Sequence, residues 1–128
     1  MLIIFKKIHI ILLPLLLVSC SHTPQRTYNS GANKEFGKAS YYADKYQNRQ
    51  TASGELFNQK KATAAHKTLR FGTWLRVTNV DNGRSVIVRI NDRGPFMKGR
   101  IIDLSKSAFS AIGNTRLGVI DVIVEVIK

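Results

Sequence analysis

The chain has 128 residues, with twenty Lys or Arg against eight Asp or Glu and a formal net charge of +12. A surface this basic attracts polyanions, but the basic residues are dispersed and no recognition helix, RNA-binding aromatic pair or zinc motif accompanies them, which argues against nucleic acid as the partner. The single cysteine excludes a disulfide framework. No metal-ligand cluster or Gly-rich phosphate loop occurs in the sequence, so we expect no metal and no cofactor.

The N-terminal segment has the pattern of an export signal. Two lysines precede the apolar run Ile8–Val18, which is shorter than the ~20 residues that a spanning helix needs. The run ends at Leu17-Val18-Ser19-Cys20, which resembles the lipobox of bacterial lipoproteins. This resemblance implies that residues 1–19 are removed and that Cys20 is lipidated and anchored in the membrane. The alternative is a chance cysteine beside an ordinary signal.

The residue after Cys20 bears on the membrane location, and the composition of residues 20–128 indicates a linker followed by one domain. Ser21 replaces the aspartate that often retains lipoproteins in the inner membrane, so the resemblance implies the periplasmic face of the outer membrane. Residues 20–36 are polar without a hydrophobic period, and we expect a flexible linker there. Residues 37–128 suffice for one small domain. Without the two lysines of the signal, eighteen basic residues face eight acids, a net charge of +10.

The domain is rich in predicted strands. Val80–Arg84 contains Asn-Gly, which accepts the positive φ angles of a tight hairpin turn. One helix is predicted over Ser105–Ile112, with Ser105 as N-cap, an apolar stripe and Gly113 as its end. Many short strands in fewer than a hundred residues favour a small closed barrel. The predicted strands are Ala39–Ala43, Trp74–Asn79, Ser85–Ile90, Arg100–Ile102 and Val119–Ile127.

Two carboxylates form the most suggestive pattern. Asp92 and Asp103 each end a β-branched run, and a loop rich in Gly, Pro and Arg separates them. Strand ends hold side chains precisely, and two acids in different environments can supply an acid and a base. The alternative is structural, with Asp92 capping its own Asn-Asp-Arg-Gly turn and Asp103 capping the helix that follows.

Four motifs together resemble one family. They are T-A-S-G-E at 51–55, T-A-A-H-K-T-L at 63–69, N-D-R-G-P-F at 91–96 and R-I-I-D-L-S at 100–105. With the lipobox, they closely resemble the rare lipoprotein A (RlpA-like) family. The resemblance implies an all-β fold, the six-stranded double-psi β-barrel of expansins, with one short helix. It also implies a lytic transglycosylase that cuts the MurNAc–GlcNAc β-1,4 bond of peptidoglycan, leaves 1,6-anhydro-MurNAc ends and prefers peptide-free strands.

The same resemblance suggests catalytic roles. Asp103 matches the general acid of expansins and related endoglucanases, and we predict that it is the acid/base, with apolar neighbours at 101, 102 and 104 favouring its protonated form. Asp92 matches the second acid, as electrostatic stabiliser or polar orienter. Glu55 is expected as a substrate-groove acid with a possible catalytic role. His66 would hold a carboxylate or a sugar hydroxyl, although a lone histidine is more often structural.

Further residues are expected to bind the substrate. Arg93 would meet a carboxylate or an N-acetyl group, and Phe96 and one of the tyrosines 41 and 42 would stack on sugars, since adjacent tyrosines on a strand face opposite sides. The expected substrate-binding residues are Arg93, Tyr42, Ser53, Phe96 and Asn58.

Two departures from the family keep a second hypothesis open. Asn58 stands where many members have Asp, and the chain ends at Lys128 without the SPOR domain of many members, so we do not expect septal targeting. The alternative is a non-catalytic, expansin-like wall-binding or wall-loosening lipoprotein. Asn58 favours this alternative, whereas the retained Asp103, Asp92, Glu55 and His66 favour the enzyme.

Overall fold

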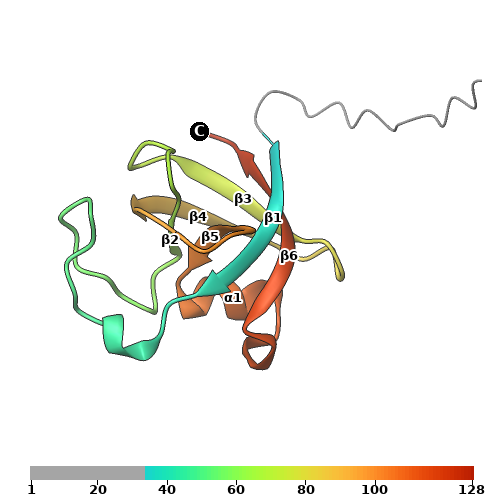
Figure 1. The fold of residues 1–128 in the computed structure, drawn as a ribbon, viewed down its shortest axis with the longest axis horizontal. Helices are drawn as coiled ribbons and strands as arrows, with labels where there is room; N and C mark the ends of the chain where they lie inside the picture. Colours follow the sequence, from blue (N-terminus) through green and yellow to red (C-terminus); the bar gives the residue numbers. More distant parts are fainter. Residues whose placement is uncertain (1–33) are drawn as a thin grey trace, which may run out of the picture.

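In the computed structural model, which describes residues 34–128, six strands close into a barrel and one α-helix lies at one end of it (Figure 1). The order around the barrel is β1-β5-β2-β4-β3-β6. The signal segment, Cys20 and the linker up to residue 33 lie outside the described residues. The elements are β1 (Lys34–Tyr41), β2 (Thr63–Ala65), β3 (Trp74–Asn79), β4 (Ser85–Asp92), β5 (Arg100–Leu104), α1 (Lys106–Ile112) and β6 (Val119–Val126), with 3₁₀ turns at Asp44–Tyr46 and Thr115–Leu117.

The pairing of the strands mixes two directions. β1 pairs in parallel with β5, and β2 in parallel with β4, while the remaining pairs are antiparallel. A closed barrel leaves no strand edge unpaired, as short strands in a small domain require. The expected closed six-stranded barrel with one helix is therefore confirmed.

Alternation along the strands builds the core. In β6, Val122 and Val124 are buried while Asp121 and Ile123 between and beside them are partly exposed, as the period of two predicts. The helix, which lies at one end of the barrel (Figure 1), contributes Ala108, Phe109 and Ile112 to the same hydrophobic cluster. The predicted apolar stripe of the helix is confirmed.

The predicted turn and helix ends are also confirmed. Gly83 has φ of 72° and its N–H donates to Asn79 O at 2.9 Å, closing the hairpin between β3 and β4. Ser105 Oγ accepts from the Ala108 N–H at the start of α1. At the other end, Asn79 and Asn82 each donate a side-chain N–H to Ile112 O at 2.8 Å. The hairpin turn thus holds the end of the helix.

Only β3 has the predicted bounds: β4 and β5 each extend two residues further than predicted, β6 ends one residue earlier, and the largest differences are in β1 and β2. β1 begins at Lys34, so residues 34–36, expected in the linker, belong to the barrel. Lys34 pairs with Glu125 of β6 and Glu35 with Val124, and backbone pairing of this kind needs no apolar pattern. β2 was not predicted because it has only three residues, two of them alanine, a poor strand former. It is a strand because β4 and β5 flank it on both sides and its residues are all buried.

No helix within residues 34–128 has the length and apolar character needed to cross a bilayer.

Candidate active site

The two predicted aspartates meet at one groove. Ala65 of β2 pairs with Asp92 on one side and with Asp103 on the other, so the two aspartate backbones are two strand spacings apart, about 10 Å. Both line an open groove of about 530 Å³. Its other lining residues are Tyr42, Tyr46, Arg49, Gln50, Arg93, Gly94, Pro95, Phe96, Met97 and Arg100. The two aspartates that the sequence pattern singled out therefore share one groove.

Asp103 is held by polar partners. Arg100 Nη2 donates to Asp103 Oδ1 at 2.6 Å, and the Ser40 hydroxyl donates to the same oxygen. Arg100 also donates to Ser40, so the three side chains form one cluster. Asp103 does not cap the helix, because Ser105 does.

The expected apolar surroundings of Asp103 were wrong. Ile102 and Leu104 are buried in the barrel core, whereas Asp103, between them on the strand, faces outward to the groove. Its carboxylate therefore meets the Arg100 guanidinium and the Ser40 hydroxyl rather than apolar side chains.

Asp92 accepts three hydrogen bonds. The Tyr42 hydroxyl donates to Oδ2 at 2.6 Å, and the Ala52 and Arg93 N–H groups donate to Oδ1, each at 2.9 Å. The bond from Arg93 belongs to the turn of Asp92, so the capping alternative is correct in part. Burial and the bond to Asp92 raise the pKa of Tyr42 well above its ordinary value. Tyr42 therefore remains a hydrogen-bond donor.

The two adjacent tyrosines face opposite sides, as alternation requires. Tyr41 packs on Phe109 of the core with ring centroids 4.8 Å apart. Tyr42 lines the groove, and its ring packs on Phe57 at 4.4 Å. Ser40, two residues before Tyr42, shares its side of the strand. This spacing was a signal in the sequence that could have identified Ser40 as a groove residue.

Arg93 and Phe96 form other parts of the groove. Arg93 Nη1 donates to Leu69 O at 2.8 Å, and its guanidinium lies 4.0 Å from the Phe71 ring centroid. Much of this side chain is therefore occupied in fixing the loop after β2. Phe96 is 83% exposed on the groove, as a sugar-stacking residue would be.

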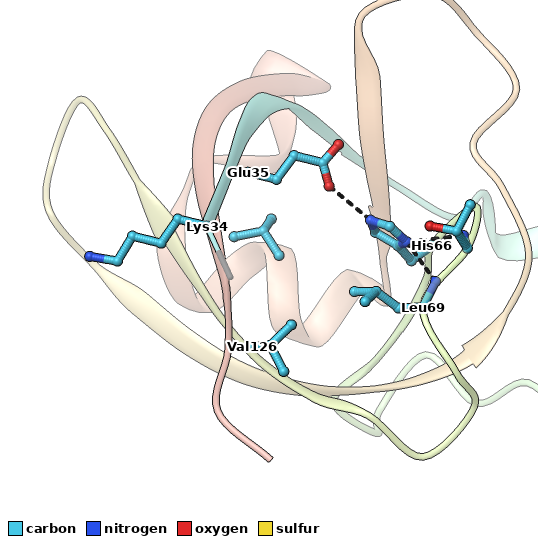
Figure 2. A pocket seen from close by; sticks show the side chains of 7 residues that line it. Lys34, Glu35, His66, Leu69 and Val126 are labelled. Atoms are coloured by element: carbon cyan, nitrogen blue, oxygen red, sulfur yellow. Dashed lines mark hydrogen bonds and ion pairs between the residues drawn. The ribbon is translucent and has the colours of Figure 1, made fainter. Parts of the chain in front are cut away.

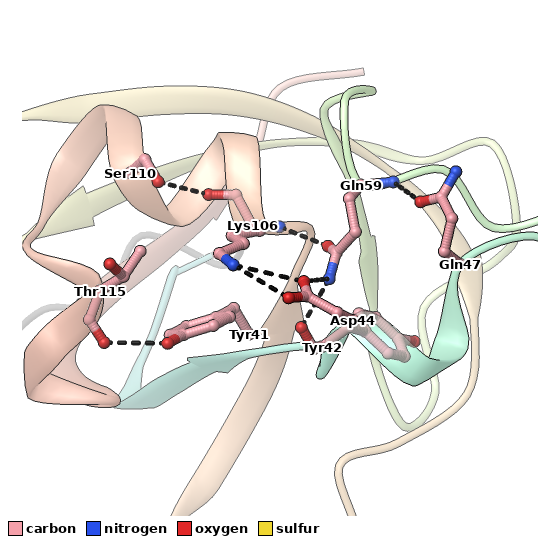
Figure 3. A network of polar contacts seen from close by, with 8 residues as sticks. All are labelled: Tyr41, Tyr42, Asp44, Gln47, Gln59, Lys106, Ser110 and Thr115. Carbon is pink, nitrogen blue, oxygen red and sulfur yellow. Dashed lines mark hydrogen bonds and ion pairs between the residues drawn. The ribbon is translucent and has the colours of Figure 1, made fainter.

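Gln59 links the loop before β2 to the residues behind the site (Figure 3). Its Nε2 donates to Tyr42 O at 2.7 Å, and its Oε1 accepts from the Lys106 N–H at 2.8 Å. Lys106 Nζ pairs with Asp44 at 3.3 Å in the same network. One amide thus fixes the backbone of Tyr42 to the start of α1.

Glu55 and Asn58 line a second groove of about 370 Å³ with Arg89, Asn91 and others. Arg89 donates to both oxygens of Glu55, at 2.6 and 2.8 Å, and these bonds hold the pKa of Glu55 to about 2. Glu55 is thus ionised at neutral pH and poorly suited to donate a proton.

Ser53, expected to bind the substrate, lines neither of these two grooves. Its hydroxyl hydrogen-bonds to Thr51 Oγ1 at 2.9 Å, and its N–H donates to Asn91 O at 3.2 Å. The same turn carries Ala52, whose N–H reaches Asp92. The T-A-S-G-E motif therefore supports Asp92 through its backbone.

His66 lies at a third groove (Figure 2), whose lining residues include neither aspartate. Its Nδ1 accepts from the Thr68 and Leu69 N–H groups, so Nε2 carries the hydrogen and donates to Glu35 Oε2 at 3.0 Å. His66 follows Ala65 on the chain, and its side chain points away from the site that Ala65 borders. It holds a carboxylate, as expected, but that of Glu35 rather than of a predicted site acid.

Sequence reasoning missed several side chains of the site, among them Arg49, Gln50 and Met97 of the groove lining. Ser40 and Arg100 contact Asp103, and Tyr46 lines the groove with Tyr42. Within residues 34–128, no group of three or more His, Cys, Asp or Glu side chains is arranged to hold a metal ion. Two carboxylates and their donors remain as the groups for acid–base chemistry.

The fold and the site define the class. An apo-expansin of Clavibacter michiganensis is similar over 74% of this chain and 50% of that one, with a TM-score of 0.60 and 24% identity. The Streptomyces papain inhibitor is similar over 76% of this chain and 96% of that one, with a TM-score of 0.63 and 22% identity. The chain is therefore a double-psi β-barrel, here with two aspartates on one open groove.

Sequence comparison gives the family. A family model described as lytic transglycolase matches residues 34–124. The endolytic peptidoglycan transglycosylase RlpA of Pasteurella multocida is 49% identical over 108 residues, 84% of this chain and 37% of that protein. RlpA of Haemophilus influenzae is 53% identical over 89 residues, 70% of this chain and 31% of that protein. The chain belongs to the RlpA-like family of lytic transglycosylases, and it spans about a third of the length of these curated relatives.

Proposed function

We propose that this protein is a lytic transglycosylase that cuts the MurNAc–GlcNAc β-1,4 bond of peptidoglycan and leaves 1,6-anhydro-MurNAc ends. The observation that carries the proposal is the placement of Asp92 and Asp103 on either side of Ala65, facing one open groove. The names of the relatives support the same activity. An open groove accepts the middle of a strand, which suits endolytic cutting.

The reaction needs one proton carrier and one negative charge. The glycosidic oxygen leaves C1 with a proton from Asp103, and the muramyl C6 hydroxyl then bonds to C1 and returns its proton to Asp103. Water is not consumed and the proton count balances. Asp92, whose carboxylate accepts from Tyr42 and two backbone N–H groups, stabilises the positive charge that develops at C1.

Further parts of the proposal concern substrate binding and location. We propose that Phe96, Tyr46 and Tyr42 contact the sugars, and that Glu55, Asn58 and Ser53 support the strand beyond the central site. Cys20 would carry the lipid anchor, on the periplasmic face of the outer membrane. Labelled palmitate should enter the parent protein and not Cys20→Ala; equal labelling would refute the anchor.

A second candidate is a non-catalytic, expansin-like wall-binding protein. The pairing of Asp103 with Arg100 favours it, because an ion-paired carboxylate carries no proton to donate. The likeness to an expansin is a likeness of fold and does not separate the two candidates.

The deciding experiment incubates the purified protein with peptide-free glycan strands and measures anhydro-muramyl products by mass. We expect Asp103→Asn to bind the strands and release no such product. Asp81→Asn, which makes the same change in the exposed β3–β4 turn, is the matched control and should retain full activity. If the parent binds strands but yields no anhydro product between pH 4 and 8, the wall-binding candidate replaces the enzyme.

A further inference from the structure

Arg100 stands between two grooves. It lines the aspartate groove, and together with Ser40 it also lines a neighbouring groove of about 520 Å³ whose other walls include Lys106 and Val119. Its side chain is 22% exposed. A ligand in either groove can therefore contact this one guanidinium.

The N–H donors of the Arg100 guanidinium differ in their hydrogen-bond partners. Nη2 contacts Ser40 and Asp103, but Nη1 has only the Met97 sulfur, at 2.9 Å, and a thioether is a weak acceptor. Nε is buried and has no hydrogen-bond partner within residues 34–128. Because Nε is shielded from both grooves, the donor left for a ligand is Nη1, and a carboxylate oxygen is a stronger acceptor for it than a thioether. Arg100 is therefore able to accept a further anion.

The surrounding charges favour an anion at this place. The cations Arg49, Arg93 and Arg100 face only two carboxylates, Asp92 and Asp103, in the aspartate groove. Arg93 is already occupied by backbone carbonyls. In the neighbouring groove, Lys106 and Asp44 pair with each other. Arg49 lies over the Tyr46 ring, 5.6 Å from its centroid, and Arg100 is the groove cation that contacts Asp103 directly.

We propose that Arg100 binds the free lactyl carboxylate of muramic acid and thereby releases Asp103 to take up a proton. The inference rests on the proposed function and adds the residue that selects the substrate. The lactyl group and the cleaved C1–O bond belong to the same sugar, so a guanidinium beside Asp103 is within reach of both. On strands that carry peptides, this carboxylate is an amide, Arg100 stays on Asp103, and cutting is slow.

The proton balance is simple. Before binding, Arg100 neutralises Asp103; after binding, Arg100 neutralises the lactyl carboxylate and Asp103 takes one proton from solvent. Asp103 delivers that proton to the leaving oxygen and regains one from the C6 hydroxyl. Release of the product returns Arg100 to Asp103 and the proton to solvent.

The test compares two substrates on the full-length protein. Peptide-free strands are used as they are, or after conversion of their lactyl carboxylates to methylamides. We expect the parent to cut the carboxylate strands with a kcat/KM about tenfold or more higher, the effect of a charge-assisted hydrogen bond. Arg100→Gln should cut both strands at similar rates, and Arg100→Lys should recover part of the preference.

Controls separate recognition from folding. Arg84→Gln makes the same charge change in the β3–β4 turn and should keep the parent's preference. Loss of structure alone would reduce cleavage of both strands and leave their ratio unchanged. If the parent itself cuts both strands equally, the inference is wrong, whether or not Arg100→Gln folds.

Binding measurements distinguish failure of the proposed enzyme activity from failure of the proposed recognition by Arg100. If the parent cuts neither strand, the proposed enzyme activity fails, and the affinities of parent and Arg100→Gln for the two strands still test the recognition. A carboxylate preference in binding that disappears in Arg100→Gln supports the role of Arg100. Equal affinities of the parent for both strands overturn it.

Discussion

Tyr42→Phe tests whether the hydrogen bond to Asp92 matters for the site. The change removes the hydroxyl that donates to Asp92 at 2.6 Å and keeps the ring that packs on Phe57. A hydrogen bond to a charged group contributes about 1.5–3 kcal/mol. Asp92 is partly exposed, and water can replace part of that contact, so we expect a loss of about 1–2 kcal/mol in the free energy of unfolding.

The neighbouring tyrosine is the matched control. The Tyr41 hydroxyl donates to Thr115 O at 2.9 Å (Figure 3), and Tyr41 does not line the aspartate groove. This neutral bond contributes about 0.5–1.5 kcal/mol, so Tyr41→Phe should lower stability slightly and leave cleavage unchanged. Tyr42→Phe should also slow cleavage about tenfold, the equivalent of about 1.4 kcal/mol in the barrier.

Two measurements check these values. Urea unfolding followed by circular dichroism gives the free energies, and the release of anhydro-muramyl ends from peptide-free strands gives the rates. The reasoning is refuted if Tyr42→Phe loses no more stability than Tyr41→Phe and cuts strands at the parent's rate.

Three further predictions concern stability and titration. Because the pKa of Tyr42 is raised, this residue should ionise last in an alkaline absorbance titration, folding stability should fall as the pH rises above about 10, and Tyr42→Phe should lack the late step. Glu55→Gln should lower the free energy of unfolding by about 0.5–1 kcal/mol at pH 7, a value discounted for the exposure of Glu55. This difference from the parent should vanish as the pH falls from 4.5 towards 2. Equal melting temperatures of the two proteins at pH 7 would contradict the prediction. Phe109→Ala should cost about 3–5 kcal/mol in urea unfolding, against little change for the exposed Ser110→Ala.

The strands with clear patterns were predictable from local sequence. Trp74–Asn79 has the predicted bounds, and the Asn-Gly turn joins it to the next strand as expected. β2 was not predictable in this way, since its three residues are a strand only because two neighbours flank them. The start of β1 was missed for the same reason: its pairing with β6 lies in a distant part of the chain.

The site was predictable in part. Asp92 and Asp103 were identified from the strand ends that carry them, and the structure brings both to one groove. Glu55 and His66 were expected with them because their motifs occur together along the chain. In the structure, Arg89 holds Glu55 in a second groove, and His66 turns to Glu35.

The sequence by itself determined which side chains share a side of each strand, because that depends only on the alternation of neighbouring residues. Only the tertiary structure decided which charges meet. Arg100 and Ser40 reach Asp103, and Tyr42 reaches Asp92, through contacts that, apart from the one from Arg100, join residues 50 or more positions apart. Such contacts depend on the order and register of strands around the barrel, and no local pattern encodes them. The partners of Asp103, on which its proposed role depends, follow from those contacts.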